Sequence, residues 1–356
     1  MNIVNRSSLI ILPVVLAISI TSTNALSYGF DENFCKSVNG KSELNFVGRE
    51  GEVAQCYAMG AGVKQNYKKA AELYKIAGTN GDVFAQNSLG HLYELGAGVE
   101  RSEQKAFEWY LKAAKQNYSG AAYDVAKYYQ EGIGIPQNSK QAIAWYLKVS
   151  TLDPNFDAGY YIGLIYALGI GIKNDPVKAD EWFEKTFLIS AGQDFTMNTK
   201  LGLMYQKGFG VKKDSAKAVK YYLKAAESGY GLALTYLGIM YESGDGVPKD
   251  DAKAAEWFKK NIELKFNSSI EGYLHLARQY EEGRGVSKDI SKAVELYEFV
   301  APSGAGIEQA QFRLGEIYEN GLGVKNDIAK AIEWYEKSST GKHQYLYVDS
   351  GMGSIR

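Results

Sequence analysis

A pair of glycines separated by one residue recurs eight times between residues 51 and 344, and it constrains the fold more than any other feature. Successive pairs stand 36 to 39 residues apart: Gly60/Gly62, Gly96/Gly98, Gly132/Gly134, Gly169/Gly171, Gly208/Gly210, Gly244/Gly246, Gly283/Gly285 and Gly321/Gly323. A period of this size is typical of stacked-repeat proteins, in which each unit contacts only its neighbours. The pattern therefore predicts one quasi-linear domain, whereas 356 residues alone suggest two or three globular ones.

Each unit is predicted to form two helices, A and B, on either side of its glycine pair. The first glycine suits the left-handed residue that ends helix A. Helix B then begins at a side chain that accepts hydrogen bonds from free first-turn amides. These eight N-cap residues are Asn66, Ser102, Asn138, Asp175, Asp214, Asp250, Asp289 and Asp327. An alanine and then an aromatic residue follow at intervals of four, which indicates packing between units more than a ligand site.

A small residue stands three positions before a tyrosine in every helix A, as Gly90 stands before Tyr93. Its recurrence predicts that another helix backbone comes close there. The pattern Leu89-Gly90-x-x-Tyr93-x-x-Gly96-x-Gly98-Val99, followed by Lys105-Ala106-x-x-Trp109-Tyr110-x-Lys112-Ala113-Ala114, resembles the Sel1-like repeat. That family belongs with the tetratricopeptide-like α-solenoids. The resemblance implies an all-α, right-handed superhelical solenoid of about eight helix-turn-helix repeats. It also implies a scaffold or adaptor role, in bacterial envelope organisation or in host-cell interaction.

The repeat pattern divides the chain into segments. We predict a solenoid over 51–344, flanked by a cap segment at 26–50 and a tail at 345–356. Its units are 51–82, 83–118, 119–155, 156–194, 195–230, 231–269, 270–306 and 307–344. Residues 1–25 have the layout of a secretory signal peptide, with Arg6, an apolar stretch over 9–20 and a cleavage point after Ala25. We expect an exported protein, periplasmic or secreted, without membrane insertion after cleavage. The alternative interpretation of residues 1–25 is an uncleaved membrane anchor.

The chain has two cysteines, Cys35 and Cys56. In an oxidising compartment they could form a disulfide between the cap and the first repeat. Alternatively, Cys56 is a small core residue, since Leu92 and Ile165 occupy its place in later repeats.

In the related tetratricopeptide solenoids, helix A lines the concave surface. By that analogy, partner-binding side chains stand around the repeated tyrosine, notably two and six positions before it. Those in the middle of the array are apolar, and those near its C-terminal end are mostly acidic. The predicted site consists of Tyr123, Tyr160, Leu164, Leu168, Leu203, Ile239, Glu242, Arg278, Glu281, Glu282, Glu316 and Glu319. We expect a protein or peptide that buries apolar anchors centrally and places basic groups toward the C-terminal repeats. Alternatively, the apolar side chains are buried and the glutamates form a solvated face.

No catalytic, metal-binding or cofactor-binding constellation is predicted. The three histidines, His91, His275 and His343, lie too far apart in sequence for a zinc motif. A net charge of -1 argues against nucleic-acid binding. The alternative function is a cell-wall-acting envelope enzyme or an accessory module of one.

The C-terminal edge leaves two alternatives open. No capping helix is predicted after Thr340, so Tyr345, Leu346 and Tyr347 could fold back on the last helix B. Otherwise the uncovered edge could be a homodimer contact.

Overall fold

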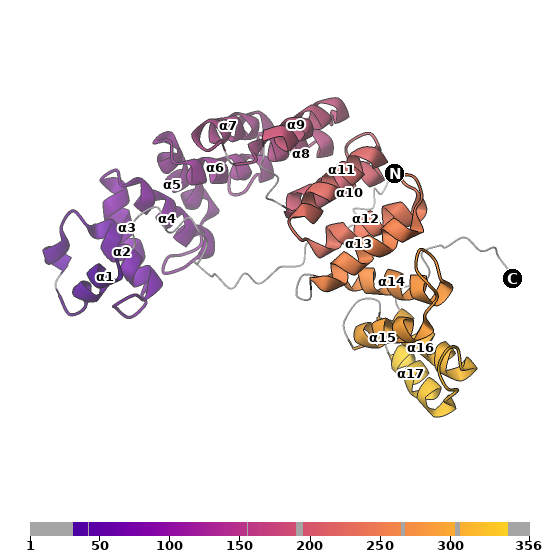
Figure 1. The fold of residues 1–356 in the computed structure, drawn as a ribbon. Helices are drawn as coiled ribbons and strands as arrows, with labels where there is room; N and C mark the ends of the chain where they lie inside the picture. The colour runs from indigo at the N-terminus through magenta and orange to yellow at the C-terminus, as the bar shows by residue number, and fades with distance from the viewer. Residues whose placement is uncertain are drawn as a thin grey trace, which may run out of the picture. The chain divides into compact units, whose positions relative to one another are not determined.

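The computed structural model describes residues 31–41, 43–154, 156–189, 195–264, 268–302 and 307–340. Within these ranges the chain forms seventeen α-helices and one short 3-10 helix, and no strand (Figure 1). The predicted signal peptide at 1–25 and the tail at 345–356 lie outside the described residues. The all-α repeat solenoid predicted from the sequence is confirmed.

The helices alternate between A and B in chain order. The cap segment contributes α1 (Glu32–Val38) and η1 (Glu43–Phe46). The A helices are α2 (Glu50–Met59), α4 (Val83–Leu95), α6 (Ser119–Glu131), α8 (Ala158–Leu168), α10 (Phe195–Lys207), α12 (Gly231–Ser243), α14 (Ile270–Glu282) and α16 (Ile307–Asn320). The B helices are α3 (Tyr67–Thr79), α5 (Glu103–Lys115), α7 (Ser139–Leu152), α9 (Pro176–Ile189), α11 (Ser215–Glu227), α13 (Asp251–Glu263), α15 (Ile290–Val300) and α17 (Ile328–Thr340).

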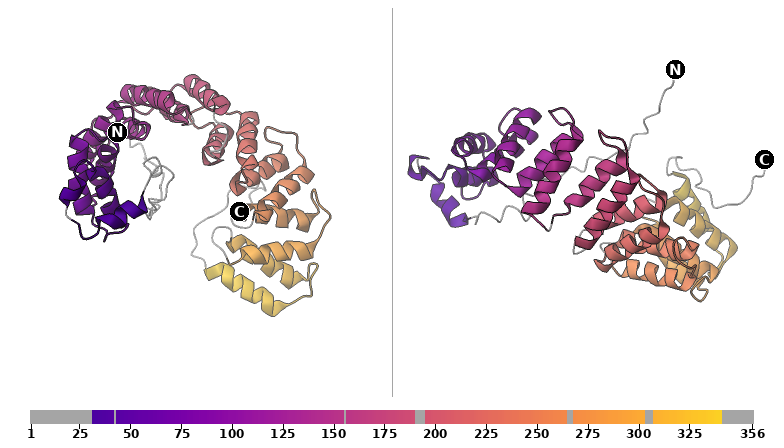
Figure 2. Two further views of the ribbon diagram at one scale, coloured as in Figure 1. Left: turned by 60° about the vertical axis from the view of Figure 1, so that its left-hand side comes forward. Right: turned by 90° about the horizontal axis from the view of Figure 1, so that it is seen from above.

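The chain divides into two compact units, residues 1–154 and 155–356, which are described separately. Within each unit, successive helix pairs stack in chain order (Figure 2). Helix A of a repeat packs on its own helix B, and that helix B packs on the next helix A. Each repeat therefore buries its apolar faces against its own partner helix and its neighbours.

The eight predicted N-caps of the B helices are confirmed. In every repeat the side-chain oxygen of the cap accepts a hydrogen bond from the amide three residues later, at 2.9 to 3.3 Å. The cap's own amide donates to the carbonyl of the repeated tyrosine, as Ser102 does to Tyr93 at 2.9 Å. This bond ties the start of helix B to the end of helix A.

The two glycines of each pair have different roles. The first ends helix A in the left-handed conformation, with φ between 64° and 76°. In six pairs the second lies against backbone from an earlier part of the chain, and Gly323 of the last pair lies against the side chain of Ile290. A Cβ on Gly134 would lie 2.8 Å from the backbone nitrogen of Gln104, in the first turn of the preceding helix B. Gly98, Gly246 and Gly285 make the same kind of approach.

The small residue of helix A faces an aromatic ring, not a helix backbone as we expected. A Cβ added to Gly90 would lie 2.5 Å from Cε1 of Tyr110, which stands on helix B of the same repeat. The Tyr110 ring also packs edge-on against Tyr128 of the next repeat, with centroids 5.6 Å apart. The repeated aromatic therefore joins both helices of its own repeat to the following one.

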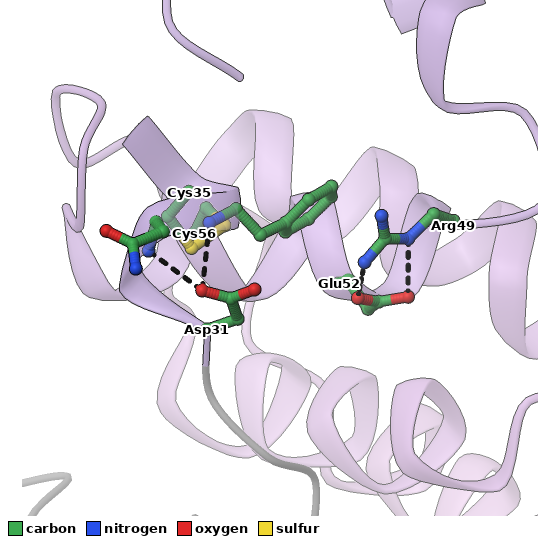
Figure 3. The surroundings of a disulfide bond; sticks show 7 residues. Asp31, Cys35, Arg49, Glu52 and Cys56 are labelled. Atoms are coloured by element: carbon green, nitrogen blue, oxygen red, sulfur yellow. Dashed lines mark hydrogen bonds and ion pairs between the residues drawn. A yellow bond between two sulfur atoms is a disulfide. The ribbon is translucent and has the colours of Figure 1, made fainter. Parts of the chain in front are cut away.

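The cap segment covers the first repeat (Figure 3). Asp31 caps α1 by accepting from the amides of Asn33 and Phe34. Cys35 on α1 is disulfide-bonded to Cys56 on α2, with the two Cα atoms 5.4 Å apart. A Cβ on Gly62 would overlap the backbone of Cys35, so α1 occupies the place of a preceding helix B.

We predict that Gly202→Ala destabilises the protein, although alanine is the better helix former by about 1 kcal/mol. The new Cβ would lie 2.5 Å from Cε1 of Tyr222, whose ring is fully buried. Overpacking of this kind costs about 1–3 kcal/mol, measurable as a lower urea midpoint. In a Tyr222→Leu background the same substitution should cost little. A Gly202→Ala protein more stable than the parent would contradict the contact.

Candidate functional site

The predicted binding residues fall in both units. Tyr123 lies on α6 in the first unit, half-buried, with its ring 6.0 Å from the ring of Tyr146. All the others lie in the second unit. The predicted site is therefore considered within each unit, and most of it belongs to residues 155–356.

The predicted central apolar residues are only partly available as surface. Tyr160 is a buried core residue whose ring contacts those of Tyr161 and Phe183. Leu164, Leu203 and Ile239 are half-buried. Leu168 alone among these five is strongly exposed, at 59%. The structure thus places one apolar anchor fully at the surface of this stretch.

Glu242 is held in an internal network between α12 and α14. His275 Nδ1 lies 2.8 Å from its carboxylate, and an Arg284 nitrogen lies 3.0 Å from it. Burial alone would raise the pKa of Glu242, but these two partners outweigh it and the pKa is lowered. Arg284 also pairs with Glu282. Glu242 and Glu282 are therefore already paired within the chain.

Glu281 and Glu316 share Arg313. The guanidinium of Arg313 donates to both oxygens of Glu281, with Nε at 3.0 Å, and to Glu316 at 2.6 Å. Tyr297 OH adds a third donor to Glu281 at 3.2 Å. These hydrogen bonds raise the pKa of Arg313, and burial raises that of Tyr297. Glu281 is 8% exposed, so it supports neighbouring side chains more than it offers a free charge.

A pocket of about 340 Å³ lies among α14, α15 and α16. It brings together four residues of the predicted site, namely Arg278, Glu281, Glu282 and Glu316. The other lining residues are Leu274, Tyr297, Gln309, Phe312 and Arg313. Of these, Leu274 and Phe312 belong to the series six positions before the repeated tyrosine. Glu242 and Glu319 do not line the pocket, and Glu319 accepts a hydrogen bond from Tyr335 OH at 2.6 Å.

Arg278 differs from the other charged residues of this pocket. No ion pair or hydrogen bond to its guanidinium is found among the described residues. Arg278 stands half-buried on α14, one helical turn after Leu274. Phe312, which is 52% exposed, also lines the pocket. The pocket therefore combines an apolar wall with one cation that has no partner in this part of the chain.

In the first unit, a titratable cluster is formed by residues of α4, α5 and α6. Tyr110 OH donates to Glu94 at 2.8 Å and lies 2.7 Å from His91 Nδ1. Asp124 interacts electrostatically with this group and with Lys127, and burial raises the pKa of its carboxyl to about 6. His91 stands two positions before the repeated tyrosine, but no sequence pattern indicates this cluster.

The described ranges contain no group of three or more His, Cys, Asp or Glu side chains that could hold a metal ion. The same ranges contain no helix with the length and apolar character needed to cross a bilayer.

A family model of the Sel1 repeat matches the chain at eight successive stretches: 51–82, 83–118, 119–153, 157–186, 198–230, 231–264, 270–299 and 308–343. The chain belongs to the Sel1 repeat family. The resemblance stated from the sequence is thereby confirmed. Sel1 repeat proteins are generally protein–protein interaction scaffolds.

Two solved structures share the Sel1 repeat fold with this chain. The c5321 protein of uropathogenic Escherichia coli strains, a protective antigen displaying an SLR fold, is 27% identical with a TM-score of 0.65. That match covers 87% of this chain but 64% of c5321, so this chain spans less than two thirds of its length. A Sel1 repeat protein from Oxalobacter formigenes is 24% identical with a TM-score of 0.62, covering 88% and 87% of the two chains. Comparison with curated protein sequences finds no match.

The cluster around Asp124 predicts a pH-dependent effect on the stability of this Sel1 repeat protein. Because burial raises the pKa of Asp124 from 3.8 to about 6, its favourable contribution is complete below pH 3.8 and is lost as the pH rises through 6. Asp124→Asn should therefore stabilise the protein at pH 7 by about 1–3 kcal/mol and have little effect near pH 3.5. Thermal unfolding at the two pH values measures the difference. Equal shifts at both would show that the ionisation of Asp124 is not the cause.

Proposed function

We propose that this Sel1 repeat protein is an exported, non-catalytic scaffold that binds a protein or peptide partner through its A helices. The pocket among α14, α15 and α16 is the proposed main contact. One observation carries this assignment. The guanidinium of Arg278 makes no ion pair or hydrogen bond with the described residues, and it stands in a pocket that the exposed Phe312 also lines. Arginine and aromatic side chains in partly desolvated pockets provide much of the affinity of protein interfaces.

The charges of the pocket favour a particular ligand chemistry. Arg313 already pairs with Glu281 and Glu316, and Arg284 pairs with Glu282. A basic ligand group would have to compete with those arginines. A ligand carboxylate would instead meet Arg278. A guanidinium pairs most strongly with a carboxylate, because it can donate two parallel hydrogen bonds to the two carboxylate oxygens. The proposed ligand is a peptide segment with an apolar side chain next to a carboxylate, which replaces our expectation of basic ligand groups here.

We predict that Arg278→Ala and Phe312→Ala each weaken partner binding at least tenfold, a loss of about 1.4 kcal/mol. The partner would be isolated with the mature chain from envelope and host-cell extracts in parallel, and affinities measured on the purified pair. Leu168→Ala is the matched control, because Leu168 is an exposed apolar residue on α8 that does not line the pocket. Unchanged affinity in both pocket variants would reject the pocket. Loss only with Leu168→Ala would transfer the contact to the central repeats.

The non-catalytic part of the proposal has its own test. The purified mature chain would be incubated with cell-wall material, and release of soluble fragments would be measured. Turnover by the chain would contradict the scaffold role and favour an envelope enzyme.

Export is supported by the sequence of residues 1–25 and by the cysteine pair. Disulfides persist mainly outside the reducing cytosol, and here Cys35 and Cys56 are bonded and nearly inaccessible, at 2% and 0% exposure. We predict that the exported chain begins at Leu26 and that neither cysteine reacts with an alkylating reagent before reduction. Intact mass and alkylation measure both. An uncleaved N-terminus, or free thiols in the native protein, would contradict the export assignment.

A further inference from the structure

The last repeat exposes a face that the earlier repeats bury. Ile332, five positions after the N-cap of α17, is 52% exposed. Six other repeats have an apolar residue at the equivalent position, and the seventh has Asp180. Five of the six are at most 8% exposed and Ile143 is half-buried: Ala71, Phe107, Val219, Ala255, Val294 and Ile143. Phe107 at this position packs against Tyr128 and Tyr129 of the following helix A. On α17 this position has no such cover among the described residues.

The repeated aromatic shows the same contrast. Tyr335 is half-buried in the last repeat. Its seven equivalents are at most 3% exposed: Tyr74, Tyr110, Tyr146, Phe183, Tyr222, Phe258 and Tyr297. Ile328, one helical turn before Ile332, is 51% exposed. Ile328, Ile332 and Tyr335 share one side of α17 by their spacing of four and three residues, and we call them the terminal apolar face.

The opposite end of the array shows how this chain covers an exposed repeat. There the first repeat is covered by α1, a segment outside the repeats, which is bonded through Cys35 to Cys56. The backbone of α1 meets Gly62 as a preceding helix B would. A non-repeat segment of the same chain thus replaces the missing neighbour.

Residues 341–356 follow α17 in the sequence and lie outside the described residues. They contain four consecutive apolar or aromatic residues, Tyr345, Leu346, Tyr347 and Val348. Ile332 stands eight residues before the end of α17 at Thr340, which is about 12 Å along the helix axis. The four residues 341–344 can span up to about 13 Å when extended. Gly341 also suits a reversal after a helix.

We infer that residues 345–348 pack on the terminal apolar face and cover the last repeat. A tethered segment competes at an effective concentration in the millimolar range when its linker matches the distance, so it outcompetes a second copy at ordinary protein concentrations. The inference is independent of the pocket at Arg278, which lies on the A helices.

A cysteine pair tests the contact in the full mature chain. Ile332→Cys with Leu346→Cys should form an intramolecular disulfide under mild oxidation, detected by mass of the monomer. Phe209→Cys with Leu346→Cys is the control, since Phe209 is equally accessible, at 61% exposure, but belongs to the loop of another repeat. We expect the first pair to cross-link at least about tenfold faster. Equal rates, or a disulfide between two chains, would overturn the inference.

A second measurement does not depend on introduced cysteines. Leu346→Asp should speed amide hydrogen exchange in residues 328–340 about tenfold, while Ile355→Asp in the same tail should leave it unchanged. Unchanged exchange in the Leu346→Asp protein would overturn the inference. So would a dimer of the parent protein that dissociates on Ile332→Asp, because a second copy would then be the occupant.

Discussion

The stacking of this protein depends on backbone meeting backbone at the second glycine of most pairs. Where Gly134 meets the first turn of α5, and Gly246 and Gly285 meet α11 and α13, a side chain would separate the repeats. Because glycine has no side chain, the two backbones meet directly, and this contact sets the distance between neighbouring repeats independently of the other side chains. The first glycine, the N-cap and the tyrosine carbonyl then hold the turn in one conformation. The repeat is conserved within the chain at the positions that build this turn and at the ring that packs beside it.

The same constraint leaves other positions free to differ from repeat to repeat. Two and six residues before the repeated tyrosine, the side chain has no fixed role in stacking, and its surroundings depend on the neighbouring repeats. Tyr160 enters the core at such a position, whereas Phe312 stays exposed at the equivalent one. Function in a repeat array resides in these variable side chains, because the invariant ones are occupied with packing. The pocket at Arg278 is assembled from variable positions of two successive A helices, together with Tyr297, the repeated aromatic of one helix B.

The fold could be predicted closely because its determinants are local and periodic. The eight N-caps, the helix-ending glycines and the order of helices all follow from residues a few positions apart. The pairing of charges could not be predicted in the same way. Arg313 reaches Glu281 across 32 positions, and His275 reaches Glu242 across 33, between repeats whose spacing varies. Neither Arg313 nor His275 stands at a position that holds the same type of residue in every repeat. A run of glutamates therefore resembled a free acidic surface, although two arginines and a histidine pair with several of them.

The repeat pattern does not specify what covers the first and the last repeat. Inside each unit, a repeat that stands between two others has its apolar faces covered by neighbours of the same kind, so its sequence needs to satisfy only the repeat pattern. A terminal repeat has one face that the pattern leaves open, and that face must be met by something non-periodic. At the first repeat this is α1, which occupies the place of a helix B and is fixed there by a covalent bond. A short helix of seven residues buries few side chains, so the disulfide supplies stability that packing alone would not. At the last repeat, Ile332 keeps the apolar character of an interior helix B, and Ile328 adds a second exposed apolar side chain, at positions where a surface helix would carry polar residues. Their chemistry is that of a covered face, and this is the physical ground for assigning the cover to the segment that follows α17.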